Sequence, residues 1–225
     1  MQSPSEKSEA VAERVAAILR DRIVKGELAP RDRIVERRLS AELHVSRTPV
    51  REALKLLEAD GLIEITHHRG ALVSEYRSED AVRLFDVIAV LEGLAARRLA
   101  EQMSAATLQQ LEDFHGQMLE HHRAGRSEQY FDLNTMIHDV IVGNCGNPVV
   151  ADTHRRLIAR ARRGRFLAIM DPERLDQAVD EHQQLMRALR ASDPSAASDI
   201  WETHLRHTGD TLAALLSRHE AENAQ

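Results

Sequence analysis

Apolar side chains in the first third of the chain recur every three or four positions in three successive runs, at 11–24, 35–43 and 50–57. That spacing is the period of a helix with one buried face, so each run predicts a helix. Gly26 and Gly61 follow the first and third runs, where glycine commonly ends a helix. Only a short link separates the second helix from the third.

Two short apolar runs follow the third predicted helix. Residues 62–65 and 71–73 have the length of strands, and the polar stretch 67–70 between them is suited to a turn. Gly70 permits the tight backbone that such a turn needs. Three helices followed by a small β-hairpin make a winged helix-turn-helix, and we assign this domain to residues 9–74.

The rest of the chain, 78–220, predicts helices only. The first begins at Ser78, where two acidic residues lie near the positive end of the helix dipole, and it continues to about Met103. Two further apolar stripes occupy residues 107–124 and 127–143. The fold class is therefore mainly α.

Three later helix starts share one sequence device, an Asn or Asp followed by proline. The Asn or Asp side chain accepts hydrogen bonds from free backbone N–H groups, and proline suits the first helical position. The pairs are Asn147–Pro148, Asp171–Pro172 and Asp193–Pro194. About six helices result, enough for an antiparallel bundle, with a domain boundary near Ser74–Ser78.

Composition changes this picture little. Aromatic residues make up only 3% of the chain, and no apolar run approaches the roughly 20 residues of a membrane span. The N-terminal stretch MQSPSEKSEA is polar, unlike a secretion signal, and the single cysteine, Cys145, suits a reducing compartment. We therefore expect a soluble, cytoplasmic protein with no membrane partner.

The charge is distributed unevenly along the chain. The formal net charge of −6 argues weakly against a nucleic-acid partner. Residues 1–76, however, hold 13 basic and 13 acidic residues, which leaves 17 basic and 23 acidic residues for 77–225. The first segment is neutral, and a neutral domain binds DNA if its basic side chains share one face.

Polar and basic residues gather at the start of the third predicted helix: Ser46, Arg47, Thr48 and Arg51. A helix-turn-helix places these first residues of its second helix in the major groove. Arg47 and Arg51 are four positions apart and project from one side, so either can hold guanine O6 and N7 with two hydrogen bonds. The competing interpretation is an ordinary solvated helix face.

Further DNA contacts are expected outside this helix. Arg37 lies at the start of the preceding helix, a suitable place for a phosphate contact. His67, Arg69 and Gly70 lie at the tip of the predicted wing and are within reach of a neighbouring groove.

The whole ordered pattern resembles the GntR family of bacterial regulators. The stretches that carry the resemblance are Gly26–Pro30, Glu36–Ser40, Val45–Leu54, Leu57–Leu62 and Arg69–Gly70. The resemblance implies that Arg37, Arg47, Thr48, Arg51 and the wing tip contact double-stranded operator DNA. It also implies a homodimer on a short near-palindromic site. Ala29-Pro30-Arg31 stands where the family usually has Pro-Gly, which affects a loop.

Three histidines in the helical segment share faces with apolar residues: His138, His182 and His204. Asn134 lies one turn before His138. Each inward ring needs a partner for its nitrogens, and a single such ring is commonly a satisfied core residue. Three of them on separate helices, with Asn134, can instead converge on one divalent metal ion.

The spacing of these residues resembles the FCD ligand-binding domain that many GntR regulators carry. The stretches are Leu133–His138, Gly143–Pro148, Asp180–His182 and Trp201–Leu205. The resemblance implies a metal, commonly zinc or nickel, held by Asn134, His138, His182 and His204. It also implies that small organic acids complete the coordination, so that the effector of this regulator is a small carboxylate.

The segment departs from that pattern at three positions. Ile137 replaces a frequent Phe, and Asn134 is a weaker ligand than the usual Asp. Ile88 stands where many members place an Arg that is thought to hold the effector carboxylate, so the acidic effector is less secure. A later predicted helix carries a cluster of four arginines: Arg160, Arg162, Arg163 and Arg165. One of them could take the place of the missing Arg if its side chain points inward, although a solvated helix face is the plainer interpretation of the cluster.

Two other functions compete with a ligand-responsive regulator. His138-Asp139 resembles the His-Asp pair of helical phosphohydrolases, yet Asp139 should point away from the histidine face. The sequence also lacks a His-Glu-x-x-His motif, a phosphate-binding glycine loop and a nucleophile elbow, so we expect no enzyme. The second alternative is a helical interaction module whose histidines are packed without a metal and which senses nothing.

Overall fold

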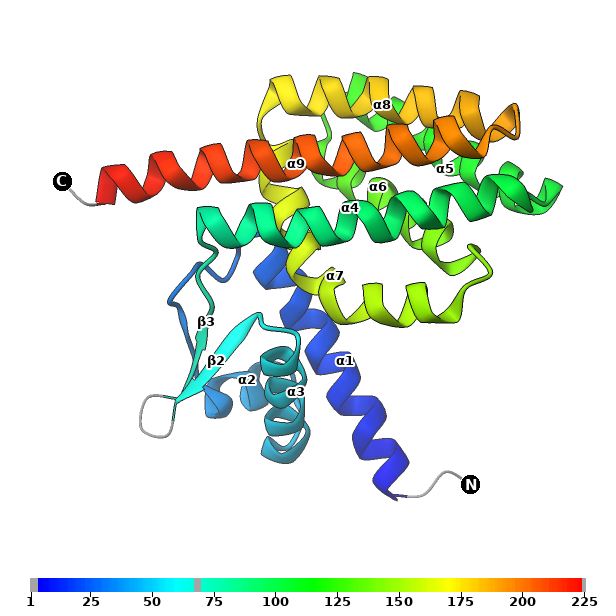
Figure 1. Ribbon diagram of the computed structural model, residues 1–225. Coiled ribbons are helices and arrows are strands. Elements are labelled where there is room, and N and C mark those ends of the chain that lie inside the picture. Colours follow the sequence, from blue (N-terminus) through cyan, green and yellow to red (C-terminus); the bar gives the residue numbers. More distant parts are fainter. Residues whose placement is uncertain (1–3, 67–69, 224–225) are drawn as a thin grey trace. The chain divides into compact units, whose positions relative to one another are not determined.

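The computed structural model describes residues 4–66 and 70–223, and the chain divides into two compact units, Met1–Tyr76 and Arg77–Gln225. The elements of the first unit are α1 (Pro4–Val24), β1 (Arg33–Ile34), α2 (Glu36–Glu42), α3 (Arg47–Ala59), β2 (Ile63–Thr66) and β3 (Gly70–Val73). Figure 1 shows them in chain order. The three helices and the β2–β3 hairpin predicted from the sequence are all present.

A third strand extends the wing beyond the predicted hairpin. β1 pairs antiparallel with β3, so the strand order is β1-β3-β2, and Ile34 lies opposite Ala71. β1 has only two residues, too few for any alternation of apolar and polar positions to be recognised in the sequence. Its buried Ile34 fastens the segment before α2 to the sheet.

The described start of α3 has no side-chain cap. Ser46 is the N-cap residue, but within the described part of the chain its hydroxyl accepts no capping hydrogen bond. An N-cap side chain normally bonds the N–H of the second or third helical residue, and the third residue here is Pro49, which has no N–H. α3 is instead held by its buried face, which includes Val50, Leu54 and Leu57.

The second unit consists of six helices among its described residues: α4 (Ser78–Glu101), α5 (Ala105–Arg123), α6 (Ser127–Gly143), α7 (Pro148–Ile169), α8 (Pro172–Arg190) and α9 (Pro194–Asn223). The predicted Asx caps are confirmed. The Asn147 side chain accepts from Val149 N at 3.1 Å, and Asp171 and Asp193 each accept from the backbone N–H three residues later. Each helix of the second half therefore starts where the sequence indicated.

Close backbone packing brings α4, α7 and α9 together. α4 and α9 run side by side in opposite directions along much of their length (Figure 1). A Cβ atom added at Gly164 or at Gly209 would lie 2.7 or 2.6 Å from the side chain of Phe85, closer than real atoms approach. The two glycines thus let α7 and α9 close around Phe85. No helix of the described residues is long and apolar enough to span a membrane.

Candidate functional site

The first candidate site is the exposed face of α3. Ser46, Arg47, Thr48 and Arg51 are all exposed, opposite the buried face of the helix. Glu36, at the start of α2, accepts hydrogen bonds from Arg47 Nη2 at 3.2 Å and from Arg51 Nε at 2.9 Å. The two arginines that the sequence singled out are therefore held side by side by one carboxylate.

A hollow lies between this face and the sheet. Its volume is about 470 Å³, and five basic side chains line it: Arg33, Arg37, Arg47, Arg51 and Lys55. Glu36 is its acidic lining residue. Gly70 lies at the same hollow with a positive φ of 77°, the conformation that the predicted wing turn needs. His67 and Arg69, which the sequence also assigned to the wing tip, lie outside the described residues.

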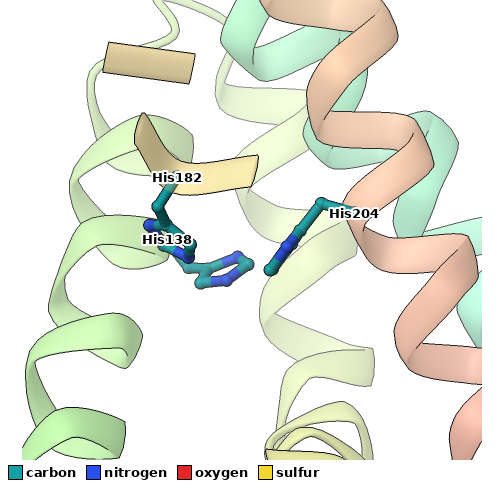
Figure 2. Close-up of side chains that lie close together, drawn as sticks. All are labelled: His138, His182 and His204. Carbon is teal, nitrogen blue, oxygen red and sulfur yellow. The ribbon is translucent and has the colours of Figure 1, made fainter. Parts of the chain in front are cut away.

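The second candidate site lies in the core of the helical unit. His138 on α6, His182 on α8 and His204 on α9 point toward one another (Figure 2), and one ring nitrogen from each lies within 4.8 Å of the others. All three histidines are at most 2% exposed. Asn134, one turn before His138 on α6, is buried as well. The four residues that the sequence grouped are thus all in the interior, and the three histidines meet.

Several polar atoms of this cluster lack hydrogen bonds. Among the described residues, Asn134 Oδ1, His138 Nε2 and both ring nitrogens of His182 are buried without a partner. Leaving such atoms unpaired in an apolar interior costs free energy, commonly about 1–3 kcal/mol each. An amide oxygen and three imidazole nitrogens are ligands that zinc and nickel accept, so the donor set fits a divalent metal ion.

Glu92 on α4 fixes the orientation of His138. One carboxylate oxygen is hydrogen-bonded to His138 Nδ1 and accepts from Trp201 Nε1 at 3.1 Å, while the other lies 2.8 Å from His154 Nε2. Burial by itself would raise the pKa of Glu92, but its interactions with His138 and His154 hold that pKa well below the usual value. Burial also lowers the pKa of His138 to about 3. An anionic Glu92 beside a neutral ring places the proton on Nδ1 and leaves His138 Nε2 free to bind a metal.

Glu181 on α8 holds the ring of His204 in the way that Glu92 holds the ring of His138. Its Oε2 lies 2.7 Å from His204 Nδ1 and 2.9 Å from Arg174 Nη2, while His207 Nδ1 lies 2.6 Å from Oε1. Burial tends to raise the pKa of Glu181, yet the hydrogen bond from His204 and the charge of Arg174 lower it to about 2. A carboxylate therefore stands behind two of the three rings, an arrangement typical of metal-bound histidine.

The sequence interpretation missed both carboxylates. Glu92 lies in the middle of an almost wholly buried apolar face of α4. A charged residue at such a position in the sequence could have been recognised as a candidate functional residue. Glu181 directly precedes His182 and offered no such signal, because helical neighbours point in different directions.

The arginine cluster of α7 divides into separate environments. Arg162 pairs with Asp139, which as predicted does not join the histidines. Arg163 and Arg165 are buried, so the interpretation of a solvated face is wrong for these two. Arg165 is 1% exposed, its Nη1 lies 4.0 Å from Glu92 Oε1, and burial lowers its pKa to about 10. Ile88, which stands where many proteins with this domain place an arginine, is buried in the core.

A winged helix with a basic recognition helix, together with a helical unit that buries three convergent histidines, is typical of a DNA-binding transcriptional regulator. Residues 11–73 match the family described as "Bacterial regulatory proteins, gntR family", and residues 83–207 match the "FCD domain". The chain belongs to the GntR family and carries an FCD domain.

Relatives and solved structures agree with this assignment. The "HTH-type transcriptional repressor RspR" of Escherichia coli is 26% identical over 90% of this chain and 89% of its own length. A "Probable D-xylose utilization operon transcriptional repressor" of Paenarthrobacter nicotinovorans is 29% identical over 85% of each chain. The structure of "E. coli McbR/YncC", 20% identical, shares the fold with a TM-score of 0.81 over 98% of this chain and all of that one. The relatives are regulators, so the expected non-enzymatic role is confirmed.

Proposed function

We propose that this regulator is ligand-responsive, and that a small organic acid bound beside a metal ion in the helical unit controls operator binding by the winged helix. The buried cluster of three histidines carries the proposal, because its unpaired nitrogens are what a metal ion would satisfy. In this scheme residues 9–74 bind DNA, and residues 78–220 bind the effector and form the dimer. Such a regulator acts on DNA in the cytoplasm.

Asn134, His138, His182 and His204 would hold the ion. When bound, a divalent ion supplies a positive charge and open coordination positions that an organic acid can fill. Zinc and nickel both suit the neutral nitrogen and oxygen donors. Glu92 and Glu181 hold two of the rings in the orientation that such an ion needs.

The DNA interface uses the exposed start of α3. Arg47 and Arg51 are the base-reading candidates, since both are exposed and an arginine can hold a guanine with two hydrogen bonds. Ser46, Thr48 and Arg37 would contact the phosphate backbone, and His67, Arg69 and Gly70 of the wing would reach a neighbouring groove. The basic lining of the hollow supports this assignment.

A homodimer would pair through the helical units. Val82, Val87, Val90 and Leu94 are between 37% and 55% exposed on α4, and the last three follow a helical stripe. Covering such a stripe with the same stripe of a second copy removes apolar surface from water. The pair of winged helices would then read a near-palindromic operator.

Control by the effector requires that it bind two arrangements of the DNA-binding heads with different free energies. The competing function is a helical interaction module whose histidines are packed without metal. The orphaned nitrogens of His182 favour the sensor, because a merely structural histidine would normally have found a hydrogen-bond partner.

Metal analysis of protein purified without an affinity tag tests the proposal. We expect about one zinc or nickel ion per chain, retained through dialysis. His182→Leu should abolish binding without removing any hydrogen bond seen among the described residues. His219→Leu, at an exposed histidine, is the matched control and should bind metal normally. No metal in the wild-type protein, and no thermal shift with added metal or organic acids, would establish the non-sensing module.

A further inference from the structure

Arg165 lies in the interior with its hydrogen-bonding capacity unused. Within the described part of the chain, Nε, Nη1 and Nη2 are all buried and none has a hydrogen-bond partner. Arginine carries five N–H donors and no acceptor, and it stays protonated at neutral pH. A desolvated guanidinium with no bonds is costly to keep in a core, so an anionic partner is expected.

Glu92 is too far away and too occupied to be that partner. Its nearest oxygen is 4.0 Å from Arg165 Nη1, beyond hydrogen-bonding distance. Both of its oxygens already bond other groups, His138 and Trp201 on one side and His154 on the other. Glu92 therefore balances the charge of Arg165 without satisfying its donors.

The position of Arg165 links it to the histidine cluster. Glu92 lies between them, with one oxygen toward His138 and the other toward the guanidinium. A small molecule that reaches the cluster is therefore close to the guanidinium of Arg165, whose N–H groups have no hydrogen-bond partner among the described residues. The planar fork of arginine matches the two oxygens of a carboxylate.

The charges of the surrounding groups indicate the charge of the ligand. Glu92 offsets Arg165, and Glu181 offsets Arg174, which lies 2.9 Å away. If the site holds the proposed divalent ion, its four ligands are all neutral, since Asn134 takes the place of a carboxylate. Two positive charges then remain uncompensated in a buried site, which a doubly anionic ligand would neutralise.

We propose that Arg165 anchors one carboxylate of the effector while the second carboxylate faces the histidine cluster, so that the effector is a small dicarboxylate. The charge argument rests on the proposed metal site, but the unpaired guanidinium does not. The effector class is thereby narrowed from organic acids in general to acids with two anionic groups.

Calorimetric titration of the full chain, zinc-free and zinc-loaded, tests the assignment. The probes are the straight-chain dicarboxylates from malonate to adipate, each compared with the monocarboxylate of the same chain length, such as succinate with butyrate. We expect at least one dicarboxylate to bind zinc-loaded protein about tenfold or more tightly than its monocarboxylate partner. The absence of any such preference would overturn the proposal.

Variants assign that preference to Arg165. Arg165→Met should abolish it while zinc still binds, and Arg165→Lys, which keeps the charge but loses the fork, should weaken it less. Arg155→Met, at an exposed arginine of the same helix, is the control. Should Arg165→Met not fold by circular dichroism, an unchanged preference in Arg165→Lys would count against the proposal and a reduced one would support it.

The zinc-free arm separates this inference from the metal proposal. If zinc never binds but a dicarboxylate binds in an Arg165-dependent way, the anchor stands and the metal site fails. If zinc binds stoichiometrically and acid binding ignores Arg165, the metal site stands and the anchor fails.

Discussion

Trp201 stacks on His204 with ring centroids 4.5 Å apart and ring planes 6° from parallel. Both residues belong to α9 and both are buried. The same indole lies 4.4 Å from the ring of His138 and 4.9 Å from that of His182. Trp201 is the only tryptophan of the chain, so its emission reports on the histidine cluster alone.

Metal binding should therefore change the fluorescence of Trp201. An ion held by the three histidines lies within a few ångströms of the indole, and the open-shell Ni²⁺ should quench its emission strongly. Zn²⁺, with a filled shell, should shift the emission with little quenching. A titration of metal-free protein with each ion, read at the emission maximum, gives both responses and the stoichiometry.

His182→Leu is the control for this titration, since it removes a proposed ligand and leaves the Trp201–His204 stack in place. It should respond to neither ion. Equal quenching by Ni²⁺ in this variant and in the wild type would mean that the ion binds elsewhere.

Glu36 is expected to set how strictly the recognition helix discriminates between sequences. Its carboxylate holds Arg47 and Arg51 together, but it also repels DNA phosphates. Glu36→Gln should therefore raise affinity for non-specific DNA and lower the preference for the operator by roughly 1 kcal/mol. Fluorescence anisotropy with operator and scrambled duplexes, at two salt concentrations, measures both effects.

Arg47→Ala and Arg37→Ala serve as reference variants for that experiment, one for the loss of a base contact and the other for the loss of a phosphate contact. Loss of a base-reading arginine should cost about 1–3 kcal/mol on the operator, whereas loss of a phosphate contact should weaken all sequences equally and reduce the salt slope by about 1. If Glu36→Gln leaves the operator preference intact, the two ion pairs do not position the arginines for reading bases.

Glu181 is expected to strengthen metal binding through His204. Its oxygen, 2.7 Å from His204 Nδ1, holds the ring and increases the electron density on Nε2. Glu181→Gln should lower zinc affinity roughly 10- to 100-fold, measured by competition with a chromophoric chelator. Glu112→Gln, which removes the partner of Arg190, should bind zinc as the wild type does. If Glu181→Gln binds zinc with unchanged affinity, Glu181 does not support metal binding and serves only as the ion-pair partner of Arg174.

The sequence was sufficient for features that local rules control. The Asx–proline starts at Asn147, Asp171 and Asp193 depend only on neighbouring residues, and each is present. The burial of His138, His182 and His204 followed from helical periodicity, because each shares a face with apolar residues. We expected the three histidines to meet because they lie on separate helices with inward faces and because the segment resembles the FCD domain. The structure brings the three rings together.

Features that depend on distant segments were out of reach. β1 forms because Ile34 pairs with Ala71 across the sheet, and a strand of two residues is too short for its own sequence to predict that pairing. The bond between Glu92 and His154 joins α4 to α7 over 62 positions. The inward orientation of Arg165, among arginines that look alike in the sequence, likewise depends on how α7 is rotated against its neighbours.

The packing around Phe85 yields a test of the fold. Gly209→Ala would place a Cβ 2.6 Å from Phe85 Cβ, whereas Gly116, exposed in the middle of α5, has nothing within 4 Å. Overpacking should cost Gly209→Ala about 1–3 kcal/mol, while Gly116→Ala should gain about 0.5–1 kcal/mol from reduced freedom of the unfolded chain. Thermal unfolding of both variants provides the comparison. Equal stability would show that α9 can move away from α4 without cost, and that the two helices are not locked at this glycine.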